Sequence, residues 1–239
     1  MHELGLARRA TAEAVGTAFL VAVVVGSGIY AQRLSPDDVG LQLLENSIAT
    51  GAALVALILA FGSVSGAHFN PVVTLADRLL GGMPTRDAGV YVIAQVIGGC
   101  VGAMVANLMF ELPAIDLSTD DRASGAHWLA EVVATFGLVM IILGVVRAGR
   151  ATAAAFAVGG YITAAYWFTS STSFANPAVT VGRMLTDTFA GIAPEAVPGF
   201  VIAQVVGALL AVALALYVFP GVPAPDLVVP HDEPLEGAS

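Results

Sequence analysis

SGAHFNPVVT, at residues 65–74, and TSFANPAVT, at residues 172–180, each contain an Asn-Pro pair that opens a short apolar stretch. Asn is a favoured helix N-cap, and Pro at the first helical position already has a helical φ and no N–H to leave unbonded. We therefore expect a helix to begin at each pair and to reach Leu80 and Asp187 respectively. Such helices would rise about 16–18 Å, roughly half the thickness of a bilayer core. The two segments predict half-spanning helices.

The rest of the chain predicts six complete spans around these half-spans. Hydrophobic residues make up 57% of the 239 positions and charged residues only 11%, against about 25% charged in an ordinary soluble domain. We expect an all-α membrane protein. A soluble helical protein is disfavoured because no expected helix has a continuous charged face, and a cleaved secretory signal is a weaker alternative for the first span. The expected spans are residues 10–31, 42–62, 88–110, 127–147, 151–168 and 197–219.

The arginines predict how these spans are oriented, because positive residues concentrate on the cytoplasmic side of a membrane protein. The chain contains no Lys, and its nine basic residues are all Arg. Six of them fall on one side of the expected spans and three on the other. We expect a multi-pass protein of the cell membrane with both termini in the cytoplasm. The first group is Arg8, Arg9, Arg78, Arg86, Arg147 and Arg150, and the second is Arg33, Arg122 and Arg183.

The two halves of the sequence repeat each other. VIAQV occurs at residues 92–96 and again at 201–205, in the same order relative to the Asn-Pro pairs. We take 10–110 and 127–219 as two copies of a three-span unit, within one domain that covers 1–219. Because three is odd, the second copy enters the membrane from the opposite face, which makes an inverted repeat. Residues 220–239 are acidic and rich in Pro, and we expect a disordered tail without assigned function.

An inverted repeat brings the two half-helices together, tip to tip, at mid-membrane. Their positive N-terminal ends and the side chains of Asn70 and Asn176 would converge there and oppose the passage of cations. Glu13 and Glu131 occupy equivalent places in apolar spans, where an unpaired charge costs at least about 2.5 kcal/mol. We expect both acids to be buried structural groups with hydrogen-bond partners; a proton relay is the alternative.

Both boxes resemble the two Asn-Pro-Ala boxes of the major intrinsic protein family, the aquaporins, with Val72 in place of the Ala of the first box. The resemblance covers residues 10–219. It implies a channel, a homotetramer with one pore per subunit, and a role for Glu13 and Glu131 as acceptors for the backbone of the loops that lead into the half-helices. Positive half-helix ends are a known barrier to cations and protons in aquaporins.

The same resemblance implies a selectivity filter at Thr50, Ala164, Ser173 and Val179. Water-selective members place aromatic and His residues at the first two positions, and nearly all members place Arg at the fourth. We therefore expect a wider, neutral constriction here. Arg183 lies one helical turn beyond Val179, at the outer vestibule. It would repel cations or steer anionic or polar solutes there, or only anchor the end of the half-helix.

The segment at 172–180 also resembles bacterial members linked to arsenic detoxification, in which Val replaces the filter Arg. We expect passive permeation of glycerol and of metalloid acids or methylated arsenicals, with some water. A water-selective channel and a secondary transporter remain the alternatives. An enzyme is disfavoured because the sequence has four scattered His, one Cys and no nucleophile or phosphate motif. We expect no cofactor, no metal and, with a net charge of -9, no nucleic acid, the partners being lipids and a small neutral solute.

Overall fold

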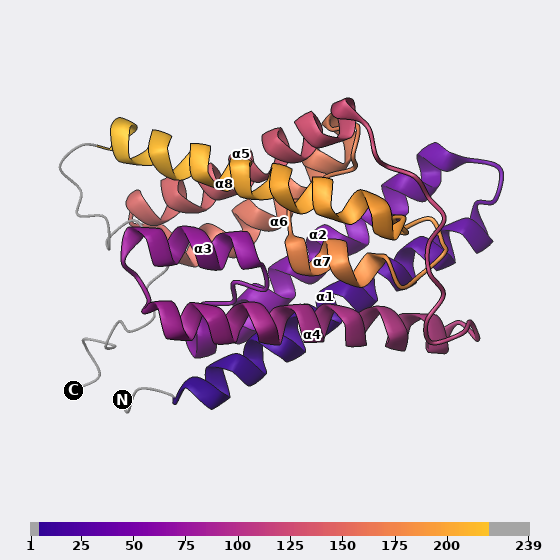
Figure 1. Ribbon diagram of the computed structural model, residues 1–239, viewed down its shortest axis with the longest axis horizontal. Helices are drawn as coiled ribbons and strands as arrows, with labels where there is room; N and C mark the ends of the chain where they lie inside the picture. The colour runs from indigo at the N-terminus through magenta and orange to yellow at the C-terminus, as the bar shows by residue number, and fades with distance from the viewer. Residues whose placement is uncertain (1–4, 220–239) are drawn as a thin grey trace.

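The computed structural model describes residues 5–219, so the expected tail at 220–239 lies outside the described residues. Within that range every element of regular secondary structure is a helix. The long helices enclose two short ones, α3 and α7, which lie end to end in the middle of the bundle (Figure 1). The elements are α1 (Leu6–Leu34), α2 (Val39–Ser65), α3 (Pro71–Leu80), α4 (Thr85–Met109), α5 (Gly125–Arg147), the 3₁₀ turn Ala151–Ala153, α6 (Ala154–Phe168), α7 (Pro177–Arg183), the 3₁₀ turn Pro194–Ala196 and α8 (Val197–Val218).

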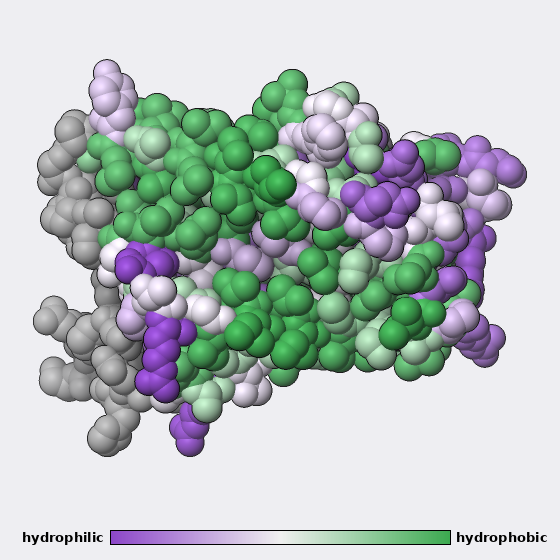
Figure 2. All heavy atoms as spheres, in the orientation of Figure 1, coloured by the Kyte–Doolittle hydropathy of each residue, from purple (hydrophilic) through white to green (hydrophobic). Residues whose placement is uncertain are grey.

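The predicted all-α fold with six long helices and two short ones is confirmed. Of the helices in residues 5–219, α1, α2, α4, α5 and α8 with its preceding turn are long and apolar enough to cross a bilayer. The sixth, α6, has 15 residues, and the expected residues 151–153 form a 3₁₀ turn before it. Figure 2 shows hydrophobic atoms covering most of the middle of one face, with hydrophilic residues toward both ends. The chain is a multi-pass membrane protein.

Local signals set several helix starts. The Asp38 side chain accepts a hydrogen bond from the backbone N–H of Leu41 at the start of α2, and Ser124 accepts one from His127 at the start of α5. Such caps satisfy N–H groups that the first turn of a helix leaves without partners. In α3 and α7 the caps are Asn70 and Asn176, each followed by Pro, as the sequence predicts.

The two half-helices differ in length, and the prediction for α7 was wrong. The first, α3, ends at Leu80, where Gly81 adopts a left-handed conformation. The second, α7, ends at Arg183, four residues before Asp187. Beyond it the carbonyls of Met184 and Leu185 accept hydrogen bonds from the backbone N–H groups at positions 118 and 116. The segment that connects the repeats therefore donates hydrogen bonds to carbonyls that would have accepted them from within a longer helix.

Close helix contacts recur at equivalent places in the two repeats. In α4, a Cβ at Gly98 would overlap the backbone carbonyl of Ala14 in α1. In α8, a Cβ at Gly207 would lie 2.5 Å from the carbonyl oxygen of Val132 in α5. Only glycine allows these two helix pairs to approach so closely. The α1–α4 and α5–α8 pairs form the walls that hold the half-helices.

Candidate functional site

The tips of α3 and α7 meet and are joined by reciprocal hydrogen bonds. Asn70 Nδ2 donates to the carbonyl oxygen of Ala175 at 2.8 Å, and Asn176 Nδ2 donates to that of Phe69 at 2.8 Å. The side-chain oxygen of each Asn caps its own helix, accepting from the N–H of Val72 in α3 and from Ala178 and Val179 in α7. Each Nδ2 carries two hydrogens. One of them is used across the interface, which leaves the second for a solute.

The loops that lead into these tips have an unusual backbone. Ala67, Phe69, Thr172, Ser173 and Ala175 all have φ between 46° and 62°. This left-handed conformation costs a residue with a Cβ about 1–2 kcal/mol. In each loop it turns successive backbone N–H groups toward one buried acceptor. The hydrogen bonds to that acceptor must offset the strain.

That acceptor is Glu13 in the first repeat and Glu131 in the second, and both are fully buried. Each carboxylate accepts four hydrogen bonds, two from loop backbone N–H groups, one from a Ser hydroxyl and one from a Gln amide. The donors to Glu13 are Ser65, His68, Phe69 and Gln95 at 2.6–3.0 Å. The donors to Glu131 are Ser171, Phe174, Ala175 and Gln204 at 2.6–2.9 Å. These contacts are the ones implied by the resemblance, and they give both acids a structural use.

A cavity of about 1050 Å³ passes the tips of both half-helices. Asn70 and Asn176 line it, and its lining extends from Arg9 and Asp87 at one end to Arg183 at the other. Arg9 and Asp87 lie at the start of α1 and of α4, whereas Arg183 ends α7. The cavity therefore connects the α3 end of the molecule with the α7 end, past both amide groups.

Three of the four predicted filter residues line this cavity on the α7 side of the tips: Thr50, Ser173 and Val179. The fourth prediction was wrong, because Ala164 is exposed on the outer face of α6. Tyr166 lines the cavity in its place, with its hydroxyl 3.1 Å from that of Thr50. Positions two apart on a helix point to nearly opposite sides. The buried stripe of Val158, Ile162, Ala165 and Tyr166 has helical spacing and was the signal available in the sequence.

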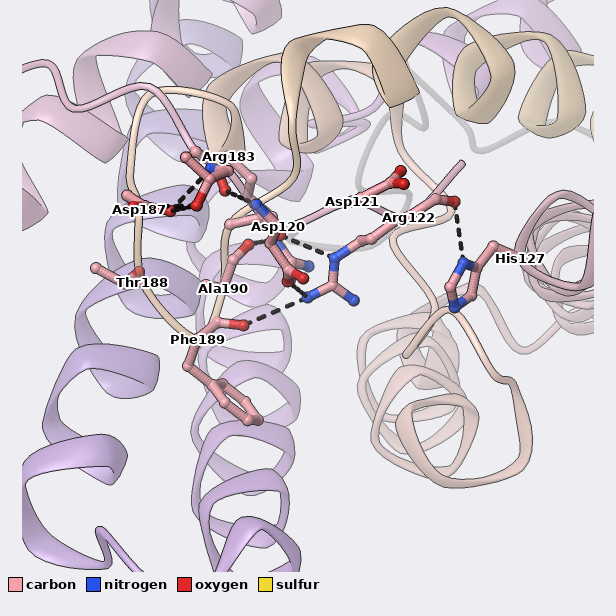
Figure 3. Close-up of polar contacts among 12 residues, drawn as sticks. Asp120, Asp121, Arg122, His127, Arg183, Asp187, Thr188, Phe189 and Ala190 are labelled. Atoms are coloured by element: carbon pink, nitrogen blue, oxygen red, sulfur yellow. Dashed lines mark hydrogen bonds and ion pairs between the residues drawn. The ribbon is translucent and has the colours of Figure 1, made fainter. Parts of the chain in front are cut away.

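Arg183 lies in the wall of the cavity and is only 2% exposed. Its Nε donates to the carbonyl oxygen of Ala190, and its Cζ lies 3.4 Å from the centre of the Phe174 ring. Figure 3 shows Arg183 beside a second arginine, Arg122, which forms an ion pair of 2.6 Å with Asp120. Sequence reasoning missed Phe174, because stacking on an arginine nine residues later depends on the loop's path.

At the α3 end the cavity wall carries a polar group that the filter prediction did not include. His68 Nδ1 lies 3.0 Å from the hydroxyl of Thr74, and His68 Nε2 lies 3.8 Å from a carboxylate oxygen of Asp77. Asp77 is buried on α3 at the place that corresponds to Arg183 on α7. Residues 5–219 contain no group of three or more His, Cys, Asp or Glu placed to hold a metal ion.

Comparisons with known proteins agree on one family. The family model for "Major intrinsic protein" matches residues 1–163. The chain is 55% identical over 214 residues to aquaglyceroporin AqpS of Rhizobium meliloti (strain 1021), covering 90% of this chain and 91% of that protein. It is 32% identical to aquaporin AqpM of Methanothermobacter marburgensis, covering 87% and 96%. The X-ray structure of the aquaglyceroporin from Plasmodium falciparum shares its fold, with a TM-score of 0.69 at 19% sequence identity. The match covers 94% of this chain and 100% of that chain.

Proposed function

Because the chain belongs to the major intrinsic protein family and is a channel for small neutral solutes, not an enzyme, we propose which solutes it carries. They are glycerol and uncharged metalloid acids or methylated arsenicals, with some water. The observation that carries this proposal is Val179, which lines the cavity where nearly all members of the resembling family place Arg. The R. meliloti relative is named an aquaglyceroporin.

The wall between the Asn tips and Arg183 suits an uncharged solute with several hydroxyls. Thr50, Tyr166 and Ser173 offer hydroxyl groups, which both donate and accept hydrogen bonds. Val179 offers an apolar surface on α7. A hydroxylated solute can exchange water for these groups without leaving a charge unpaired, whereas a cation would lose its hydration shell without a compensating partner. The Tyr166 side chain makes the passage narrower than the four small filter residues expected from the sequence would make it.

The centre of the passage opposes cations and interrupts chains of hydrogen-bonded water. Both half-helices point their positive N-terminal ends at it. The free hydrogens of Asn70 Nδ2 and Asn176 Nδ2 can donate to one solute oxygen. A water held in that way has its own hydrogens directed outward, so it cannot relay a proton through the centre.

We place this channel in the cell membrane with both termini in the cytoplasm, as a homotetramer. The bias of six arginines to three supports the orientation. Arg9 and Asp87 then line the cytoplasmic end of the cavity and Arg183 its outer end. Exposed large apolar side chains on α2 and α6, among them Ile48, Phe156 and Trp167, supply lipid-facing or subunit-facing surface. Mass measurement of the detergent-solubilised protein tests the tetramer.

Uptake into proteoliposomes tests the solute proposal. Glycerol and arsenous acid uptake and osmotic water flow are measured for the native protein and for Val179→Arg. We expect the added Arg to reduce glycerol and arsenous acid uptake more than water flow, because it fills the constriction. Equal uptake of both solutes in the two proteins would contradict the role of Val179. Solute uptake that depends on a proton or sodium gradient would indicate a transporter instead of a channel.

A further inference from the structure

We propose that Arg183, Ser173 and the Thr50–Tyr166 pair form a binding site for small oxyacids, solutes in which two or more hydroxyls share one central atom. The site lies in the passage on the α7 side of the Asn tips. It rests on the proposed function, since the solute must reach it through the channel. It assigns selectivity to Arg183, a residue one turn away from the position that resembling channels use.

The charge of Arg183 has no carboxylate partner in the described part of the chain. Arg9 pairs with Asp87 and Arg122 with Asp120, and His68 lies 3.8 Å from a carboxylate oxygen of Asp77, so each of these contacts leaves Arg183 out. A guanidinium has five N–H donors in a planar fork, and the hydrogen bonds of the described residues use only Nε. The Phe174 ring covers a face of the group, so the remaining donors at its edge are available to the cavity that Arg183 lines.

Ser173 provides an independent indication that a ligand binds here. Its side-chain oxygen is buried, and within residues 5–219 it has no hydrogen-bond partner. A buried hydroxyl left without a partner costs about 1–3 kcal/mol. Its backbone φ of 54° belongs to the strained loop held by Glu131, so the residue is fixed beside the passage. Because Ser173 lines the cavity, a solute there is the partner that we infer for this hydroxyl.

The opposite wall completes the site and indicates the class of ligand. Thr50 and Tyr166 present two hydroxyls 3.1 Å apart, and Val179 presents a small apolar surface. The fork of an arginine matches two oxygens that share one atom, as in carboxylates and phosphates. An oxyacid can place two oxygens on Arg183 and still direct a third toward the hydroxyls. Glycerol carries its three hydroxyls on separate carbons and matches the fork less well.

Boric acid and glycerol make a matched pair of probes, because both are uncharged at neutral pH and both carry three hydroxyls. Their uptake at low concentration is measured in proteoliposomes for the native protein, Arg183→Met, Arg183→Lys and Ser173→Ala. Arg33→Met is the control, since it removes an exposed arginine in the last turn of α1, near the same end of the molecule. Circular dichroism and size-exclusion chromatography select the variants that fold.

We expect the ratio of boric acid to glycerol uptake to fall about tenfold in Arg183→Met, as loss of a charge-assisted hydrogen bond predicts. Arg183→Lys, which keeps the charge without the fork, should fall by an intermediate factor, and Ser173→Ala by about threefold. Arg33→Met should keep the native ratio. If Arg183→Met does not fold, the uptake ratios of Ser173→Ala and Arg183→Lys test the proposed site.

Ratios within twofold of native in the folded variants would overturn the site while leaving the channel proposal intact. A native protein that carries glycerol but not boric acid would overturn the ligand class. If neither solute enters faster than into empty liposomes, the proposed function itself fails. The three results are therefore distinguishable.

Discussion

Glu131→Gln tests whether the buried carboxylate holds the loop that carries Ser173. The native carboxylate accepts four hydrogen bonds, each worth about 1.5–3 kcal/mol because the acceptor is charged. Glutamine has the same shape but one acceptor oxygen, so two donors lose their acceptor at a cost of about 3–6 kcal/mol. Removing the charge from the membrane interior returns about 2.5–3.5 kcal/mol. At the midpoints of these two ranges the net loss of stability is about 1.5 kcal/mol.

The assay is equilibrium unfolding in mixed micelles with increasing sodium dodecyl sulfate, followed by circular dichroism. Thr135→Val is the matched control: Thr135 lies one turn along α5 and is fully buried, and its hydroxyl has no partner in the described range. Replacing it with an isosteric apolar group should leave stability unchanged or raise it. We expect glycerol uptake to fall with stability in Glu131→Gln. Native-like unfolding of Glu131→Gln, or an equal loss in Thr135→Val, would refute the reasoning.

Three further predictions follow from other contacts. Gly98→Ala should lower stability in the same micelle assay by about 1–3 kcal/mol, since its Cβ would overlap Ala14. Gly89→Ala on the same helix is the control, because a Cβ there meets open space and should not lower stability. Asn176→Asp places a carboxylate against the Phe69 carbonyl, which now accepts from Nδ2, and should admit cations; an unchanged rate of proton-gradient decay in liposomes would count against this. Asp87→Asn removes a partly exposed ion pair and should cost less than about 1 kcal/mol, so a larger loss in the unfolding assay would contradict that small contribution.

Features set by local signals were predictable from the sequence, and features set by distant contacts were not. The start of each half-helix follows from Asn and Pro, and the end of α3 from the glycines at 81 and 82. No such signal follows Arg183, because α7 ends through backbone hydrogen bonds with residues 116 and 118. Tyr166 was missed for another reason, since the filter position was carried over by spacing and fell two residues short of the buried stripe.

The stacking of Arg183 on Phe174 shows the same limit within the candidate site. Both residues are visible in the sequence, but the left-handed residues at 172, 173 and 175 bend the loop so that the ring faces the guanidinium. The carboxylate of Glu131, forty-three residues away from Phe174, fixes that bend. A local pattern can identify such an arginine, but it cannot show which group covers it.

The reciprocal bonds of Asn70 and Asn176 have a consequence for assembly of the chain. Each amide donates to a carbonyl that belongs to the opposite repeat, so neither repeat can complete its own tip while the other is missing. The first half, once synthesised and inserted, therefore lacks the partners of Asn70 Nδ2 and of the Phe69 carbonyl until the second half folds against it. Two fragments divided between α4 and α5 should each be unable to carry solute alone, and co-insertion of both should restore the passage.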